Sequence, residues 1–182
     1  TSGKYSGAIS FNGSQYLTSS WLNLTNGSTI CTWLKPVSDG TKMFISKAYV
    51  YGEWNGYYFA QQAGNKLQFI VGDGHIGYHT GGFTTNSVLS YGVWQHVCAV
   101  WRGDGFTEIY YNGVNQTGAI TGSNFTYSTA NGQPLTFGRN VPSETTYPIP
   151  YDGSLDAVRI WNRSLTLSEI GQVYATNLAK YS

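Results

Sequence analysis

Charged side chains are scarce in this chain of 182 residues: Asp, Glu, Lys and Arg make up 10% of it, and the formal net charge is +1. A chain without a basic stripe cannot neutralise a run of phosphates, so we expect no nucleic-acid partner. No apolar run approaches the roughly 20 residues that a membrane-spanning helix needs. We therefore expect no membrane span either.

Paired carboxylates are also lacking. A glycoside hydrolase needs two, one acting as an acid and the other as a base or nucleophile. The nine acidic residues are scattered, with no two within three positions: Asp39, Glu53, Asp73, Asp104, Glu108, Glu144, Asp152, Asp156 and Glu169. The three histidines show no zinc-ligand spacing. The sequence therefore predicts a protein that is not an enzyme.

Turn-forming and aromatic residues are abundant, with 23 Gly, 15 Tyr and 6 Trp. Such a composition is typical of an all-β protein with many turns. Alternating apolar runs between turn residues predict strands at 6–11, 15–18, 28–36, 42–47, 56–62, 66–72, 94–101, 106–111, 134–138 and 154–161. Asn112-Gly113 predicts a tight hairpin, and Gly64-Asn65 a second turn. The stretches 73–92, 114–133 and 139–153 are predicted to be irregular.

The segment 152–170 predicts a turn, a strand and then a helix over about 166–174. Asp152-Gly153 supplies the turn, and apolar residues alternate after it. Thr166 and Glu169 form a capping-box pattern, and Leu165 with Ile170 forms a hydrophobic staple around it.

A final strand closed by a capped helix resembles the end of the laminin-G-like and pentraxin-like jelly rolls of the concanavalin A-like superfamily. Segments 8–17, 28–36, 92–114 and 134–138 resemble, in the same order, the opening hairpin, the long early strand, the central hairpin and the strand before the closing loop. The resemblance implies one domain over residues 1–182. Its expected fold is an antiparallel two-sheet β-sandwich, a jelly roll, with one short C-terminal helix.

Two cysteines, Cys31 and Cys98, each fall inside a predicted strand. The residues alone allow two buried thiols or a bridge, whereas the resemblance implies a disulfide between them. A disulfide indicates an oxidising compartment. Six Asn-x-Ser/Thr sequons point the same way, at Asn12, Asn23, Asn26, Asn115, Asn124 and Asn162, of which Asn162 is expected to be partly hidden. We expect an extracellular or cell-surface glycoprotein.

The resemblance also implies a structural calcium ion near the first hairpin and the last strand. Asp156 matches its carboxylate ligand, with Asn12 and Gly13 from the hairpin and backbone carbonyls assisting. The alternative is that Asp156 caps the chain locally or pairs with Arg159. A pentraxin two-calcium site is not expected, because Glu144 is the only acidic residue of segment 138–144 and Arg139 opposes a cation.

Aromatic and polar side chains gather in two predicted loops. Sugar rings stack on Trp and Tyr, while amides and carboxylates bind hydroxyls. The candidate ligand-binding residues are Tyr49, Tyr51, Glu53, Trp54, Asn55, His75 and Tyr78. The alternative is that these tyrosines are half-buried sheet residues.

Two non-catalytic functions fit these observations. The first is a binding module for a glycan or glycoprotein ligand, in recognition or adhesion. The second is a glycosylated structural subunit that self-associates into an extracellular filament, coat or adhesin. Because such folds host many functions, the sequence does not choose between them.

Overall fold

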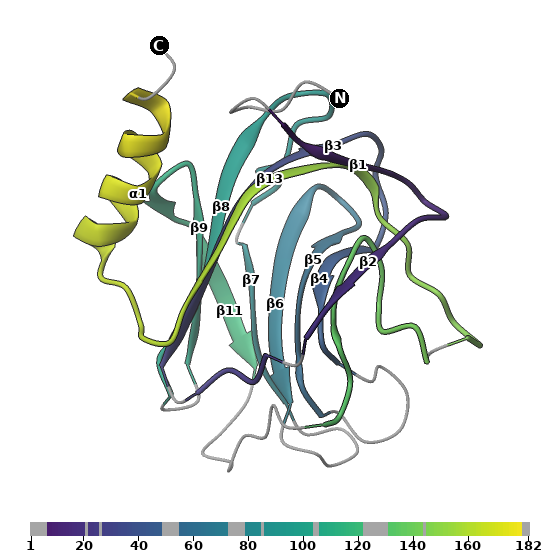
Figure 1. Ribbon diagram of the computed structural model, residues 1–182. Coiled ribbons are helices and arrows are strands. Elements are labelled where there is room, and N and C mark those ends of the chain that lie inside the picture. The colour runs from purple at the N-terminus through teal and green to yellow at the C-terminus, as the bar shows by residue number, and fades with distance from the viewer. Residues whose placement is uncertain are drawn as a thin grey trace.

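A computed structural model describes residues 7–20, 22–25, 27–48, 55–72, 79–84, 86–103, 106–121, 131–143 and 145–179. These residues form two antiparallel sheets packed face to face, with one helix outside them (Figure 1). The predicted all-β sandwich with a C-terminal helix is confirmed.

The six-stranded sheet has, in spatial order, β1 (Ile9–Asn12), β13 (Asp152–Trp161), β3 (Ser28–Pro36), β8 (Gln95–Trp101), β9 (Thr107–Tyr111) and β10 (Val114–Asn115). The seven-stranded sheet has β11 (Thr117–Thr121), β7 (His79–Thr84), β6 (Lys66–Gly72), β5 (Tyr57–Gln62), β4 (Lys42–Ser46), β12 (Leu135–Phe137) and β2 (Leu17–Ser19). The helix α1 spans Leu167–Ala179. Because β1 pairs with β13, the first and last strands lie side by side.

The core lies between the two sheets and is rich in aromatic rings. Phe44 of β4, Phe59 of β5 and Phe69 of β6 are at most 1% exposed, and their ring centroids are 4.8 and 5.9 Å apart in succession. From the other sheet, Ile30 and Val97 complete this layer. Leu67, Phe69 and Val71, at alternate positions of β6, all belong to this layer, as the period of two along a strand requires.

Three strands appear where the sequence predicted irregular structure, namely β7 in segment 73–92 and β10 and β11 in segment 114–133. In β7 the glycines suggested turns, but they serve packing instead. A Cβ atom on Gly81 would lie 2.0 Å from Ile70 Cδ1 on the neighbouring strand. Glycine inside a strand often marks such a close approach. The helix also continues to Ala179 rather than ending at 174.

The predicted turns and cap are confirmed. Asn112 and Gly113 have φ angles of 48° and 80°, as a tight hairpin with two left-handed residues requires. At the start of α1, the Glu169 amide donates to Thr166 Oγ1 at 3.3 Å, and the Thr166 amide donates to Glu169 Oε2 at 2.8 Å. Two backbone donors that the helix itself leaves unpaired are satisfied in this way.

The outer faces of the two sheets are covered differently. On the six-stranded sheet, α1 packs over Cys31, Cys98 and their neighbours, at the left of Figure 1. Cys31 and Cys98 therefore lie on the outer face of this sheet, under the helix. On the seven-stranded sheet, Tyr58 and Ile70 are buried in a small cluster against Ile149 of segment 138–151. Among the described residues, no helix is long and apolar enough to cross a membrane.

Candidate functional site

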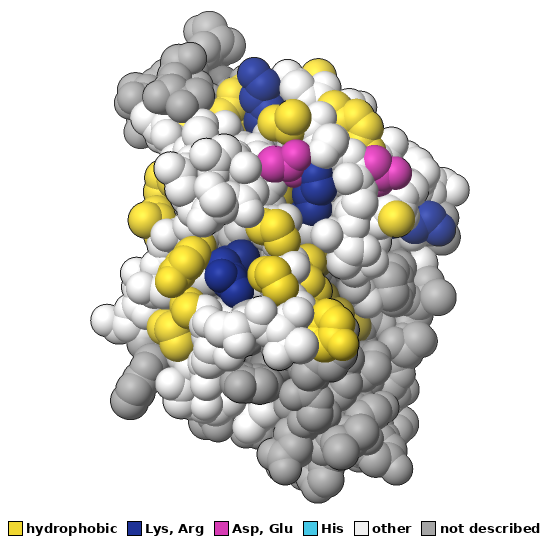
Figure 2. Space-filling view, turned by 90° about the vertical axis from the view of Figure 1, so that its right-hand side faces the viewer, with side chains coloured by type: hydrophobic (Ala, Val, Ile, Leu, Met, Phe, Trp, Pro, Cys, Tyr) yellow, Lys and Arg dark blue, Asp and Glu magenta, His cyan; other side chains and the backbone are white. Residues whose placement is uncertain are grey.

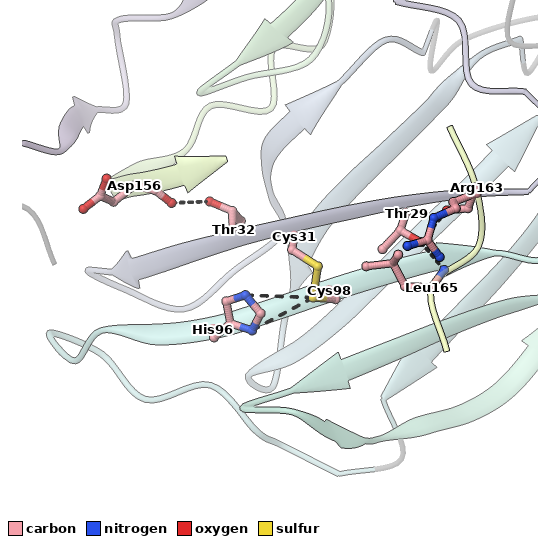
Figure 3. Close-up of a disulfide and its surroundings, with 8 residues drawn as sticks. All are labelled: Thr29, Cys31, Thr32, His96, Cys98, Asp156, Arg163 and Leu165. Atoms are coloured by element: carbon pink, nitrogen blue, oxygen red, sulfur yellow. Dashed lines mark hydrogen bonds between the residues drawn. A yellow bond between two sulfur atoms is a disulfide. The ribbon is translucent and has the colours of Figure 1, made fainter. Parts of the chain in front are cut away.

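The predicted disulfide between Cys31 and Cys98 is present and links β3 to β8 at directly opposed positions (Figure 3). His96 lies beside it, 2% exposed, with both ring nitrogens 4.0 Å from Cys98 Sγ. Burial, and secondarily the charge of Arg159, lowers the pKa of His96 to about 4. These three residues could otherwise ligate a metal, but the bridge consumes both thiols.

Most of the predicted ligand-binding residues lie outside the described part of the chain: Tyr49, Tyr51, Glu53, Trp54, His75 and Tyr78. Asn55 is described, and it ends the first of the two predicted loops. Its Oδ1 atom is buried and accepts no hydrogen bond from the described residues. The structure therefore tests the stem of this loop but not its tip.

The stem of the predicted loop is held by a polar cluster under its two ends. The Asn131 side-chain amide donates to the carbonyls of Lys47 and Asn55, at 2.5 and 2.7 Å. Lys47 is fully buried, and its Nζ donates to Asn131 Oδ1 at 2.6 Å. Burial lowers the pKa of Lys47. Gly56 completes the stem at a φ of 109°, where a Cβ atom would lie 2.0 Å from the Lys47 carbonyl oxygen.

The residues predicted to bind calcium are not brought together. Asn12 pairs with Asp152 across the β1–β13 ladder, four positions from Asp156. At about 3.3 Å per residue, the two backbones are about 13 Å apart along the ladder. Two oxygen ligands of one calcium ion lie at most about 5 Å apart, twice the Ca–O distance. Asn12 Oδ1 instead accepts from the Ser14 amide and hydroxyl, and Gly13 lies in this turn. Asn12, Gly13 and Asp156 therefore do not form one calcium site.

Asp156 takes part in a bulge of β13. Its Oδ1 atom accepts from the Ala157 amide at 2.7 Å, and its carbonyl accepts from the Thr32 hydroxyl at 3.1 Å. Ala157 adopts a φ of 49°, a left-handed conformation rare for alanine. The carboxylate thus caps the bulge, which agrees with the local alternative for Asp156. Calcium binding by Asp156 with backbone carbonyls alone stays a prediction.

Four of the six predicted sequons are described, and their asparagines are exposed: Asn12, Asn23, Asn115 and Asn162. The expectation that Asn162 is partly hidden is wrong, because the chain has left the sheet at this position. Asn26 and Asn124 lie outside the described residues. Exposure makes glycosylation of the four sterically feasible.

The described carboxylates all have structural partners. Asp39 accepts from the Gly64 amide, Glu108 from Arg102 and Tyr110, Asp152 from Lys42 and Ser38, Asp156 from Ala157, and Glu169 from Arg163 and Thr166. Arg163, with the Thr166 amide, lowers the pKa of Glu169 to about 2. A general acid needs the opposite shift. Glu53, Asp73, Asp104 and Glu144 are outside the described residues.

A second aromatic surface, which the sequence did not predict, lies on the side of β1, β2 and segment 138–151. Figure 2 shows this side, where apolar side chains gather around basic ones. Tyr16 is 41% exposed, and the guanidinium of Arg139 lies 5.3 Å from its ring centroid. Tyr147 is 52% exposed, and its backbone is held by the buried Asn140, whose Nδ2 donates to the Tyr147 carbonyl at 2.9 Å.

A groove of about 270 Å³ between β13 and α1 was also not predicted, and Arg159, Trp161 and Gln172 line it. A signal for it was present in the sequence. Arg159 and Trp161 are two positions apart in a predicted strand and therefore share a face. Only the folded chain shows that the helix lies beside that face.

Residues 11–171 match a family model described as the concanavalin A-like lectin/glucanases superfamily. The chain belongs to this superfamily. No curated protein sequence matches the chain, so the assignment rests on the family model. The resemblance seen in the sequence is thereby confirmed.

Solved structures share the fold at low sequence identity. A native heptameric SAP-like pentraxin from Limulus polyphemus matches with a TM-score of 0.70 and 19% identity, covering 92% of this chain and 81% of the pentraxin. Domain 4 of the arabinanase AbnA from Geobacillus stearothermophilus, in complex with arabinotriose, gives 0.70 and 21%, over 96% and 79% of the two chains. The CBM40 domain of a Ruminococcus gnavus IT-sialidase, bound to α2,3-sialyllactose, gives 0.71 and 10%, over 92% and 96%. At these identities the likeness shows the fold alone.

Proposed function

We propose that this chain is a non-catalytic carbohydrate-binding module that is secreted or displayed at the cell surface. The observation that carries this proposal is the assignment of every described carboxylate to a structural contact, in a fold shared with sugar-bound domains. Two of these domains were solved with arabinotriose and sialyllactose. The disulfide supports an oxidising compartment.

The stem described above supports the loop 49–55 as one ligand-binding element. A loop that must present aromatic side chains to a sugar gains affinity when its ends are already ordered. Asn131 donates hydrogen bonds to the backbone on both sides of the loop, and Lys47 donates a hydrogen bond to Asn131. The buried, unsatisfied Asn55 Oδ1 atom offers an acceptor for a bound water that would complete the stem.

The test is glycan-array binding of the purified chain, with calcium and again with a chelator. We expect binding to a defined sugar class, and a loss of affinity of roughly 2- to 13-fold for Trp54→Ala, since an aromatic stacking contact contributes about 0.5–1.5 kcal/mol beyond area burial. Tyr91→Ala is the matched control, because Tyr91 is a solvent-exposed aromatic that is not among the candidate ligand-binding residues.

Absence of binding to any glycan on the array, both with calcium and with a chelator, would contradict the proposal. The structural-subunit alternative would then be tested by light scattering of the purified chain, where concentration-dependent oligomers are its expected result. Binding that survives chelation would keep the carbohydrate module and remove calcium from ligand contact.

A further inference from the structure

The groove between β13 and α1 is built from two regular elements rather than from loops. Arg159 and Trp161 are two positions apart in β13 and share its outward face. Glu169, Gln172 and Thr176 are spaced three or four positions apart and share one face of α1. At about 270 Å³ the groove approaches the lower end, roughly 300 Å³, of small-molecule sites, so it suits one sugar ring.

The segment that joins the two walls of the groove, and that contains Arg163 and Leu165, is fixed to β3. The Thr29 hydroxyl donates to the Arg163 carbonyl at 3.0 Å and accepts from the Leu165 amide at 2.9 Å (Figure 3). Arg159 stands opposite the disulfide-bonded Cys31 in the β13–β3 ladder. Sites held by rigid elements keep their geometry before a ligand arrives, which lowers the entropic cost of binding.

The charges in the groove leave one guanidinium available. Arg163 forms an ion pair with Glu169 at 2.7 Å, and the second oxygen of Glu169 accepts from the Thr166 amide at 2.8 Å. Arg159 is exposed and has no ion-pair partner among the described residues. Two arginines against one carboxylate give this groove a net charge of +1, which favours an anionic ligand.

The apolar wall beside Arg159 is the indole of Trp161. This side chain is partly buried and packs against the cluster that contains Cys31, Leu165 and Ile170, so its orientation is fixed. A flat ring next to a planar, two-pronged cation matches a pyranose that carries a carboxylate. The C–H face of the sugar packs on the indole, and the carboxylate accepts two parallel hydrogen bonds from the guanidinium.

We propose that this groove binds a carboxylated sugar residue, a uronic or sialic acid, of an acidic glycan. The inference rests on the proposed carbohydrate-binding function and assigns it a site and a sugar class. Trp161 supplies the stacking surface and Arg159 the carboxylate contact. On the helix side, the Gln172 amide and the Thr176 hydroxyl are the groups that can bind ring hydroxyls.

The experiment is titration calorimetry with four probes: the methyl glycosides of glucuronic acid and N-acetylneuraminic acid, methyl glucoside, and glucose 6-sulfate. We expect one of the two carboxylated sugars to bind and methyl glucoside to bind at least tenfold more weakly. Arg159→Gln should weaken binding of the carboxylated sugar roughly 10- to 100-fold, the effect of losing a charged hydrogen bond. Arg159→Lys should restore it only partly, because an ammonium cannot bind a carboxylate through two parallel bonds.

The matched control is Lys66→Gln, which removes one positive charge from the other sheet. Equal losses in Lys66→Gln and Arg159→Gln would indicate a general charge effect and overturn the site. Binding of neutral glycans on the array with no effect of Arg159→Gln would overturn this inference and leave the proposed function intact. Preference for the sulfated probe would overturn the carboxylated-sugar assignment. No glycan binding of any kind would overturn the proposed function as well.

Discussion

The two outer faces of the sandwich bury their side chains by different means. The six-stranded sheet is covered by a regular, capped helix. Under this helix lie the disulfide and the rings of Trp33 and His96, and Tyr174 of the helix stacks on Trp33. The seven-stranded sheet is covered in part by the irregular segment 138–151, through Ile149. A helix meets a twisted sheet along a line and leaves a groove beside it, whereas a loop follows the surface that it covers.

The stabilising chemistry of the two faces differs accordingly. The helix side contains a covalent link, a capping box and a buried imidazole. The loop side depends on neutral hydrogen bonds, from Tyr58 to Gln68 and from Asn140 to its own segment. We therefore expect redox conditions and pH to act mainly on the helix side. The following changes test this difference, from the largest expected effect to the smallest.

Removal of the disulfide should have the largest effect. The bridge closes a loop of 67 residues, and the chain-entropy relation assigns such a loop about 4 kcal/mol of stabilisation. We expect the double variant Cys31→Ala, Cys98→Ala to lose about that much free energy of unfolding in urea. The wild type in a dithiol reductant is the control, and it should unfold at a similar urea concentration. An unchanged midpoint in both would show that packing under α1 suffices without the bridge.

Acidification should weaken the helix side through His96. The unfolded imidazole takes up a proton near pH 6.5, the folded one only at about pH 4, so the unfolded state binds more protons between these values. Stability should therefore fall by about 3 kcal/mol as the pH drops from 6.5 to 4. His96→Phe keeps a ring against Trp33 and should flatten this dependence in urea unfolding. A slope that persists in the variant would assign it to other groups.

Loss of the Asn140 side chain should act on the loop side alone. Asn140 is fully buried, accepts from the Ile149 amide at 2.9 Å and donates to the Tyr147 carbonyl. Asn140→Ala should cost about 2 kcal/mol, because two hydrogen bonds are lost inside the fold. Limited proteolysis should then cleave segment 138–151 first. Ser143→Ala in the same segment is the control, and equal sensitivity in both variants would remove the special role of Asn140.

Loss of the helix cap should have a smaller effect, and this effect should fall on the helix side. Thr166→Ala removes the hydroxyl that accepts from the Glu169 amide, and such caps contribute about 1 kcal/mol. Circular dichroism during thermal unfolding would measure this loss of stability against the control Ser168→Ala, which changes a neighbouring exposed serine.

Glu169 adds a pH dependence of its own. Because its folded pKa of about 2 lies below the ordinary value of 4.5, its stabilising contribution should be lost as the pH falls from 4.5 towards 2.

Calcium should have the smallest effect, because Asn12 and Asp156 are too far apart along their strands to share an ion. We expect the melting temperature to be the same in millimolar calcium and in a chelator. A calcium-dependent rise that disappears in Asp156→Ala would restore the site predicted from the resemblance, built on Asp156 and backbone carbonyls.

Local patterns in the sequence were sufficient for much of the fold. Alternation and turn residues predicted β3, β6 and the Asn112-Gly113 hairpin, because strand period and left-handed turns depend on neighbouring residues. The capping box was equally readable, since it involves residues three apart. The strand β7 was missed because its Gly81 leaves room for Ile70 on the adjacent strand. This contact joins residues far apart in the sequence, so no local pattern predicts it.

The chain by itself determined its class of fold, its tight turns and the start of its helix, all of which follow from interactions between near neighbours. The cysteine pairing came from the family resemblance. Only the tertiary structure decided which strand faces lie under α1, that Asn12 faces Asp152, and that Arg159 and Trp161 border a groove with Gln172. Such juxtapositions depend on sheet register and on how α1 packs, and a shift of one residue would turn each side chain to the opposite face.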